Sequence, residues 1–201
     1  GIIDVSTLGG LDVRGPDAAE LLNRLYTFAF VKQPVGRSRY ALMTNEHGVV
    51  IDDGVCARLA EQHFYVTATT SGVDRIYQQM LQWNAQWRLN VDITNVTAAL
   101  AAVNLAGPDA RRVLSKLCSD VDLSAAAFPY LGVRQGTVAG IKARLLRVGF
   151  VGELGYEIWC HPDDAMQVWQ RVWQLGEPLG LVPLGLDALD TLRIEAGLIF
   201  A

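Results

Sequence analysis

RGPDAAELLNRL, from Arg14 to Leu25, is matched 92 positions later by AGPDARRVLSKL, from Ala106 to Leu117. In each copy a Gly-Pro-Asp turn follows an apolar segment and precedes leucines at helical spacing, which predicts a strand, a turn and a helix. The proline fits the first position of a helix because its fixed φ needs no hydrogen-bond donor there. The aspartate places negative charge at the helix N-terminus. One such helix start is common, so the information lies in the repeat.

The offset of 92 continues beyond this phrase. Gly48 falls on Gly140, the strand-like residues 65–67 fall on residues 157–159, and the helical SGVDRIYQQML falls on DDAMQVWQRVW. Each half therefore predicts a strand, a helix, two strands forming a hairpin, and a second helix. This pattern indicates an internal duplication.

A period of 92 residues is too long for a solenoid. We therefore expect an α+β fold with two similar halves, about 8–90 and 100–182, each with a largely antiparallel sheet and flanking helices. A ligand is expected where the two halves meet, since concave surfaces form at such places.

Composition narrows the classes of function. The chain has 201 residues, is 51% apolar and carries a net charge of -4. Its 17 basic residues form no run, which argues against nucleic acid and leaves a small anionic ligand open. The apolar runs fall short of the roughly 20 residues of a membrane span, and no signal peptide opens the chain. Cys56, Cys118 and Cys160 lack metal or redox spacing, so we expect buried free thiols and a cytoplasmic location.

The stretch YALMTNEHGVVIDDGVCARL, residues 40–59, contains a candidate functional pair. Gly48 is predicted to turn a hairpin, after which Asp52 and Asp53 lie side by side in an apolar strand. Because adjacent strand residues face opposite sides, one of them should point inward, where a carboxylate needs a partner. The alternative is that both are turn or edge residues in water.

The stretch LLRVGFVGELGYEIW, residues 145–159, is expected to occupy the corresponding place in the second half. Gly149, Gly152 and Gly155 surround Phe150, and such closely spaced glycines permit close backbone approach. The alternative is an ordinary glycine-rich hairpin loop.

Other common site motifs are missing from the sequence. There is no P-loop, no G-x-G-x-x-G after a strand and no HExxH. His47, His63 and His161 are isolated, so we expect surface or capping roles for them. Trp83 and Trp87, one helical turn apart, should pack on a neighbouring element or at a subunit interface.

Six motifs in order resemble the T-protein (aminomethyltransferase) folate-binding family, and the match runs nearly end to end. They are DVS at residues 4–6, RGPDA at 14–18, RYALM at 39–43, VIDD at 50–53, GFVGELGYE at 149–157 and DTLRIEAGL at 190–198. Within the family, GIIDVSTLG, KQPVGRSRYALM and IDDGVCARLA most resemble the C-terminal folate domain of the α subunit of heterotetrameric sarcosine oxidase.

This resemblance implies a tetrahydrofolate-binding domain that passes a one-carbon unit from an amine-derived iminium to tetrahydrofolate, giving 5,10-methylenetetrahydrofolate. Tetrahydrofolate is the implied cofactor, and flavin or NAD would be held only on other domains or subunits. The implied partners are flavin-containing oxidase subunits, with no nucleic acid and no membrane. Two alternatives stay open: a glycine cleavage T-protein, and a non-catalytic folate-binding assembly or regulatory protein.

The resemblance also assigns roles to residues. Asp53 matches the catalytic carboxylate, with Asp52 as the fallback, and would stabilise the iminium and handle the proton. Glu157 matches the glutamate that grips the pterin, because a carboxylate accepts two N–H donors in a fork. Tyr40 and Phe150 match aromatic positions beside the pterin, although each could instead be plain core. No metal site is implied.

Three observations limit how far the family's properties can be assigned to this chain. Leu189 stands where the glycine cleavage enzymes carry an arginine, which favours the oxidase branch. Residues 193–200 contain no cysteine, unlike the relatives that assist iron-sulfur assembly. The family's C-terminal β-barrel is missing here, so we expect a piece of a longer protein or a shortened relative. Such a chain should by itself bind folate weakly and show no catalysis.

Overall fold

The computed structural model describes residues 1–198, which form two compact units. One unit is Thr7–Thr97, and the other combines Gly1–Ser6 with the segment from Ala98 onward. The predicted half-repeats, about 8–90 and 100–182, lie inside these two units. No helix in the described part of the chain has both the length and the apolar character needed to cross a membrane.

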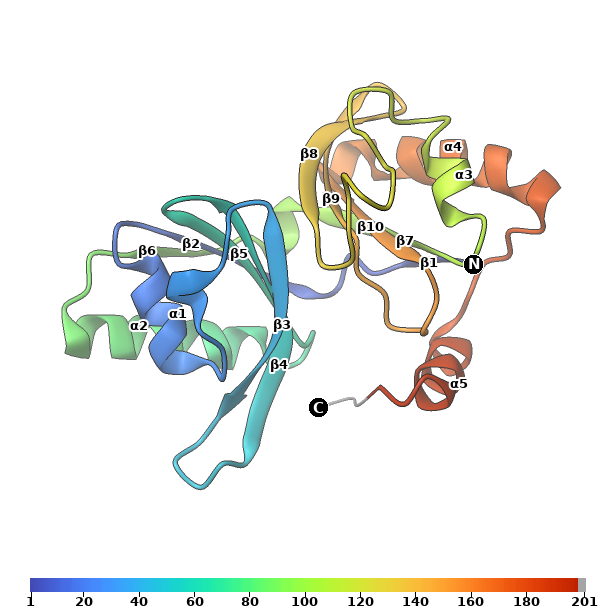
Figure 1. Cartoon of the computed structure of the whole chain (residues 1–201). Helices are drawn as coiled ribbons and strands as arrows, with labels where there is room; N and C mark the ends of the chain where they lie inside the picture. Colours follow the sequence, from blue (N-terminus) through green and yellow to red (C-terminus); the bar gives the residue numbers. More distant parts are fainter. Residues whose placement is uncertain (199–201) are drawn as a thin grey trace. The chain divides into compact units, whose positions relative to one another are not determined.

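The Thr7–Thr97 unit is an antiparallel sheet of five strands in the order β3-β4-β5-β2-β6, with helices α1 and α2 on one face (Figure 1). Its core forms where Leu11 and Val13 of the sheet meet Leu21 of α1 and Ile76 of α2. Its elements, in chain order, are β2 (Gly9–Arg14), α1 (Ala18–Leu25), η1 (Phe30–Lys32), β3 (Arg37–Thr44), β4 (Val50–Ala60), β5 (His63–Ala68), α2 (Val73–Trp87) and β6 (Asp92–Asn95).

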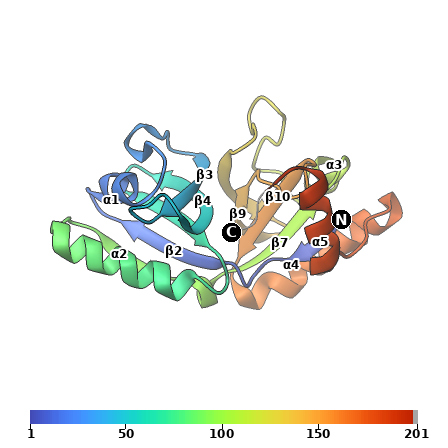
Figure 2. The same cartoon turned by 90° about the horizontal axis from the view of Figure 1, so that it is seen from below.

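The other unit repeats this plan with the strand order β1-β7-β10-β9-β8. Figure 2 shows α4 running along β7 in this unit and α2 running along β2 in the other. Its elements are β1 (Ile2–Asp4), η2 (Thr97–Ala99, at the junction of the units), β7 (Ala101–Ala106), α3 (Ala110–Leu114), β8 (Val133–Val138), β9 (Ile141–Leu146), β10 (Gly155–Cys160), η3 (Pro162–Asp164), α4 (Ala165–Gly176), η4 (Glu177–Leu179) and α5 (Leu186–Glu195).

Strand register confirms the 92-residue repeat. Strands β2 and β5 pair from Gly9↔Ala68 to Arg14↔His63, and strands β7 and β10 pair from Ala101↔Cys160 to Ala106↔Gly155. Every pair of the second set lies 92 positions after its counterpart in the first. The glycines that follow β2 and β7, Gly15 and Gly107, also share a positive φ, 139° and 127°. The two halves therefore have the same local geometry where their sequences match.

The edge strand next to the repeated pair is supplied differently in the two units. In the Thr7–Thr97 unit it is β6, which follows α2 in the chain. In the other unit it is β1, from the N-terminal end of the chain, where Ile2 pairs with Leu105 and is fully buried. After α4 the chain runs beside this strand instead, as the bridge from Ile2 to Pro183 shows, and then forms α5.

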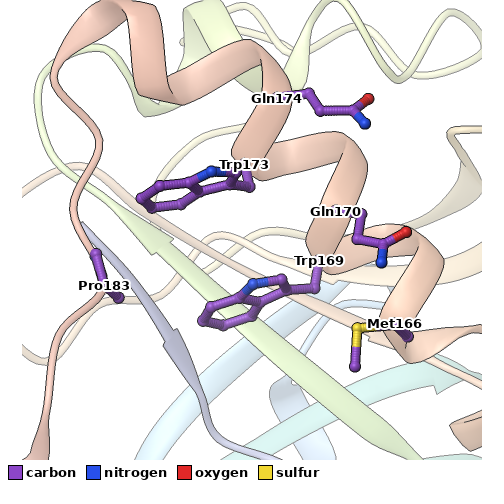
Figure 3. Close-up of a pocket in the computed structure, with 6 residues that line it drawn as sticks. All are labelled: Met166, Trp169, Gln170, Trp173, Gln174 and Pro183. Atoms are coloured by element: carbon purple, nitrogen blue, oxygen red, sulfur yellow. The ribbon is translucent and has the colours of Figure 1, made fainter.

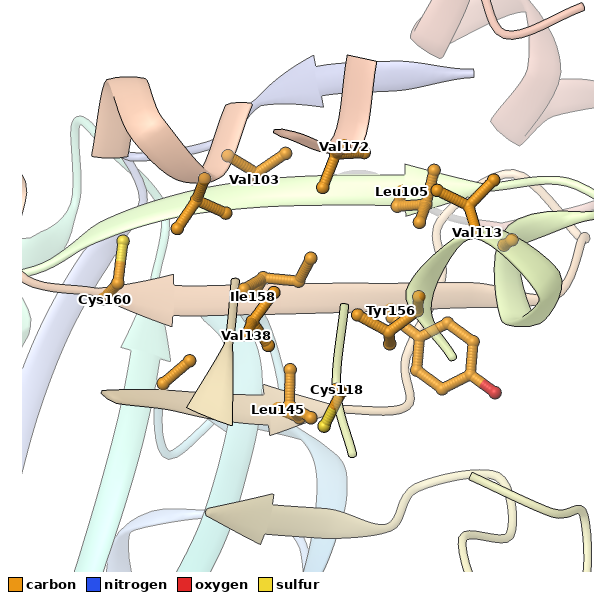
Figure 4. Packing of buried hydrophobic residues seen from close by; sticks show 14 of the residues in the cluster. Val103, Leu105, Val113, Cys118, Val138, Leu145, Tyr156, Ile158, Cys160 and Val172 are labelled. Carbon is orange, nitrogen blue, oxygen red and sulfur yellow. The ribbon is translucent and has the colours of Figure 1, made fainter. Parts of the chain in front are cut away.

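Figure 4 shows the core of the second unit, in which residues of β7, β9 and β10 meet α3 and α4. Tyr156 and Ile158 of β10 are fully buried in it. Cys118 and Cys160 belong to this core, while Cys56 belongs to the core of the Thr7–Thr97 unit. All three cysteines are buried and free, as the sequence predicted.

Three details of the sequence prediction were wrong. The first helix of each half begins after the Gly-Pro-Asp turn, with Asp17 and Asp109 as N-caps, so the proline precedes the helix. Each half has three consecutive strands where two were expected, because a second hairpin follows the first. The two candidate stretches are not equivalent either. Residues 40–59 span the β3–β4 hairpin, whose counterpart is β8–β9, whereas the glycine-rich stretch links β9 to β10.

Candidate functional site

The Asp52–Asp53 pair lies in the part of β4 that extends past its neighbour β5. Strand β4 pairs with β3 along nearly its whole length but with β5 only from Cys56 to Ala60. At the point of separation, Gly54 approaches the Thr67 carbonyl so closely that a Cβ on Gly54 would lie 1.9 Å from the oxygen. The pair is thus held on a strand that is anchored on one side and open on the other.

Asp52 is the inward member of the pair, with only 2% of its surface exposed. Its Oδ1 accepts hydrogen bonds from the backbone N–H groups of Asp53 (2.7 Å) and Thr69 (3.1 Å), and its Oδ2 accepts one from the Thr69 hydroxyl (3.2 Å). The expectation that one carboxylate points inward and needs partners is therefore confirmed. Asp52 ties β4 to the loop that leads into α2.

Asp53 faces the opposite side of the strand and is half-buried. Its Oδ2 accepts a hydrogen bond of 2.7 Å from the hydroxyl of Tyr40, whose side chain is 42% exposed. Burial raises the pKa of Asp53, the Tyr40 hydrogen bond lowers it, and the nearby charge of Asp52 raises it, with a net upward shift. An accessible carboxylate with a raised pKa can take up and return a proton.

The hydroxyl of Tyr40 acts as a hydrogen-bond donor to Asp53. Burial, the hydrogen bond to Asp53 and the charge of Asp53 all raise the pKa of its phenol. The hydroxyl therefore stays protonated and remains a donor to the carboxylate. Strand pairing explains the contact, because Tyr40 lies opposite Val55 on β4, two residues from Asp53 and on the same face.

Glu157 belongs to the other unit, on β10, opposite Asn104 of β7 and Leu146 of β9. Burial raises the pKa of Glu157, and a hydrogen bond from the indole N–H of Trp159 (2.9 Å, to Oε2) partly opposes this rise. The net pKa is about 7. This carboxylate changes charge near neutral pH and has an oxygen, Oε1, to offer to a further donor.

Phe150 lies partly buried in the loop between β9 and β10. The glycines around it do make close approaches. A Cβ on Gly155 would lie 2.6 Å from the Val148 carbonyl oxygen, and one on Gly152, which has φ +73°, would lie 2.8 Å from the Cβ of Ala196. The loop is thus packed against itself and against the chain just after α5, which favours close packing over an ordinary loop.

His47, which is exposed, and His161 have the predicted surface and capping roles, whereas His63 is largely buried beside Asp12. His161 caps the η3 helix by accepting a hydrogen bond from the N–H of Asp163, and His63 lies 3.2 Å from a carboxylate oxygen of Asp12. Across residues 1–198, no group of three or more potential metal-ligating side chains comes together. Trp83 and Trp87 stack on each other with 4.9 Å between ring centroids.

Two surface hollows differ in chemistry. One lies along α4 and is largely aromatic and apolar, with two indole rings side by side (Figure 3). None of its lining residues is titratable; they are Met166, Trp169, Gln170, Trp173, Gln174 and Pro183. The other is smaller and polar, and contains Asp52, Thr69, Ser71 and Arg75 at the start of α2. Of the predicted site residues, Asp52 lines the polar hollow.

The structure thus groups the predicted residues by unit: Tyr40, Asp52 and Asp53 in one, and Phe150 and Glu157 in the other. Sequence reasoning did not single out two of their partners, Thr69 and Trp159. For Trp159 the available signal was its position two residues after Glu157 on a strand, which places both side chains on one face.

Comparison with known proteins shows which proteins this chain is similar to. The family model described as the GCVT N-terminal domain matches residues 1–201. The sarcosine oxidase subunit alpha of Corynebacterium sp. (strain U-96) is 40% identical over 202 residues, covering 99% of this chain and 21% of that protein. An aminomethyltransferase of Alkaliphilus metalliredigens (strain QYMF) is 34% identical over 198 residues, covering 98% of this chain and 53% of that protein.

A solved structure shows the same fold. The glycine cleavage system aminomethyltransferase T from Bartonella henselae superposes with a TM-score of 0.84 at 25% sequence identity. The match covers all of this chain and 52% of that one. The chain thus spans about half the length of the aminomethyltransferases it matches and about a fifth of the sarcosine oxidase subunit.

Proposed function

The chain belongs to the GCVT N-terminal domain family, and from this premise we propose that it is the tetrahydrofolate-binding domain of a one-carbon transferase of the sarcosine oxidase α-subunit kind. Identity of 40% to that subunit, against 34% to 37% to aminomethyltransferases, supports this branch. So does Leu189, which stands where the glycine cleavage enzymes carry an arginine. The proposed partners are oxidase subunits that hold the flavin.

Asp53 is the proposed catalytic residue, and the contact that carries this assignment is its hydrogen bond with Tyr40. The two oxygens of Asp52 are committed to Thr69 and to the backbone of Asp53. Asp53 keeps an accessible carboxylate oriented by one phenol. It would stabilise positive charge on an iminium carbon unit and accept the proton that the attacking amine loses. Asp52 holds the strand in place beneath it.

Glu157 is the proposed anchor for the pterin, and its surroundings fit a ligand with N–H donors. Within the described chain, its carboxylate receives one side-chain hydrogen bond, from Trp159 to Oε2. Oε1 is left to accept from the pterin edge. The bound folate would supply the nucleophilic amine that receives the carbon unit. Tyr40 and Phe150 would offer ring surface to the flat pterin.

Two substitutions test the division of roles. Asp53→Asn should leave folate affinity nearly intact and slow one-carbon transfer by about 10²-fold or more, the usual scale for losing a proton-handling group. Glu157→Gln should weaken folate binding by about 1 to 3 kcal/mol, because a charge-assisted contact is lost. Calorimetry and single-turnover rates on the full protein provide the two measurements. An equal loss of affinity in both variants would overturn the assignment.

A further inference from the structure

Trp159, two residues beyond the GFVGELGYE motif, makes a contact with the proposed anchor, Glu157. Its indole Nε1 lies 2.9 Å from Oε2 of Glu157, two residues earlier on β10. Residues i and i+2 of a strand share a face, so the backbone itself brings the two side chains together. Only 1% of the Trp159 surface is exposed, which fixes the ring as a support for the carboxylate.

In this contact Trp159 is the hydrogen-bond donor and the Glu157 carboxylate is the acceptor. An indole N–H can donate a hydrogen bond but cannot accept one, so it favours the ionised carboxylate over the carboxylic acid. The contact occupies Oε2 and leaves Oε1 for a ligand. Burial raises the pKa of Glu157 to about 7, and the Trp159 hydrogen bond opposes that rise. Without the donor, a larger share of Glu157 would be protonated at neutral pH.

The other groups on this face make no equivalent contribution. The residues opposite Glu157 are Asn104 on β7 and Leu146 on β9, neither of which is charged. The charged residue on the adjoining strands nearest to this register is Arg144 of β9, which lies opposite Trp159. The pKa of Glu157 is shifted by burial and by the Trp159 hydrogen bond, with no resolved contribution from the charge of Arg144. Trp159 is therefore the donor that the strand places on the carboxylate.

We infer that Trp159 is a positioning residue, which aims the Glu157 carboxylate and keeps it ionised for a ligand that presents an N–H edge. The inference deepens the proposed function and rests on it for the identity of the ligand, a reduced pterin. The effect on Glu157 itself does not depend on that identity, because it is present in the ligand-free chain.

The first test needs no ligand. The Glu157 carboxyl carbon is titrated by NMR in the ¹³C-labelled chain, with Glu157→Gln to assign the signal. Trp159→Phe keeps an aromatic ring but removes the donor, and should raise the titration midpoint by about one pH unit or more. The matched control, Trp169→Phe on α4, should leave it unchanged. An unchanged midpoint in Trp159→Phe would overturn the inference.

A second replacement guards against a packing defect. Site-specific insertion of benzothienylalanine at position 159 keeps the shape of indole and exchanges the N–H for sulfur. It should raise the midpoint as phenylalanine does, whereas a normal midpoint would show that packing, and not the donor, sets the ionisation and would overturn the inference.

The second test uses tetrahydrofolate as the probe. A midpoint moved from about 7 to about 8 lowers the ionised fraction at pH 7 about fivefold, and affinity should fall by the same factor. At pH 9 the parent and Trp159→Phe should bind tetrahydrofolate with the same affinity. A purely structural defect would weaken binding at both pH values. Failure of the unmodified full-length protein to bind tetrahydrofolate would contradict the proposed function, while the ligand-free titration would still decide the role of Trp159.

Discussion

Asp52 and Asp53 are chemically identical neighbours that do different work, because a strand turns successive side chains to opposite faces. Asp52 meets three donors in the interior, whereas Asp53 meets a single phenol at the surface. The sequence predicted that one of the two would point inward. It could not say which, because that depends on the register of β4 against β3 and on the position of the Thr69 loop.

Tyr40→Phe should raise the pKa of Asp53 by about one unit, because the hydrogen bond that stabilises its ionised form is lost while burial remains. NMR titration of the Asp53 carboxyl carbon measures the change. Tyr130→Phe, at a tyrosine that is 59% exposed, is the control. A fixed Asp53 titration in Tyr40→Phe would mean that the phenol does not tune this carboxylate.

Glu157 should make stability depend on pH in a defined window. Its pKa rises from 4.5 to about 7 on folding. Burial of this carboxyl group therefore does not lower the free energy of unfolding below pH 4.5. The free energy of unfolding is lowered progressively between pH 4.5 and pH 7, and by a constant amount above pH 7. Glu157→Gln removes this destabilisation. The variant should therefore gain stability over the parent by up to about 3 kcal/mol between pH 4 and pH 8, less whatever solvent screens.

Urea unfolding at a series of pH values measures this difference. Glu177→Gln, at an exposed position on η4, serves as the control and should follow the parent curve. Parallel curves for Glu157→Gln and the parent would show that folding does not raise the pKa of this group.

At the scale of elements, the start of α2 and the strand β4 are held together by the Asp52 contacts. Gly72, the N-cap of α2, lies so close to them that a Cβ there would be 2.2 Å from Oδ2 of Asp52 and 2.5 Å from the Thr69 hydroxyl. The sequence predicted the helix α2 correctly. It gave no sign that the residue before the helix must be glycine, since the constraint comes from a strand 20 residues earlier.

Gly72→Ala should therefore destabilise the protein by about 1 to 3 kcal/mol, because the methyl group forces apart hydrogen bonds to a buried carboxylate. Thermal unfolding measures the effect. Gly185→Ala is a matched control, since Gly185 is also an N-cap, of α5, and a Cβ there meets nothing within 4 Å. Equal stability of the two variants would show that the space around Gly72 is not limiting.

At the scale of the whole molecule, the duplicated plan could be predicted because the two copies still share turn residues and apolar spacing. The register of β2 with β5 and of β7 with β10 bears this out pair by pair. The three-stranded meander was missed because its third strand is separated from the second by only a short turn. The source of β1 was missed because the fifth strand of the second unit comes from outside the repeat.

Deletion of residues 1–6 should destabilise the unit that begins at Ala98 and leave the Thr7–Thr97 unit unaffected. Ile2 and Ile3 are 0% and 5% exposed, and each buried isoleucine contributes about 1.5 to 3 kcal/mol. Amide hydrogen exchange should quicken in β7 and β10, while β2 and β5 keep their protection. Faster exchange spread evenly over both sheets would contradict the division into units.

Strand β1 also sets an order of events during synthesis on the ribosome. Ile2 is translated before the Thr7–Thr97 unit, but its partner Leu105 follows only after that unit has been made in full. At bacterial and eukaryotic speeds, about 100 residues take on the order of 5 to 20 s. That interval is ample for the intervening sheet to form, so β1 stays apolar and unpaired while the Thr7–Thr97 unit folds. The second unit is therefore completed by a strand that was translated before the whole of its neighbour.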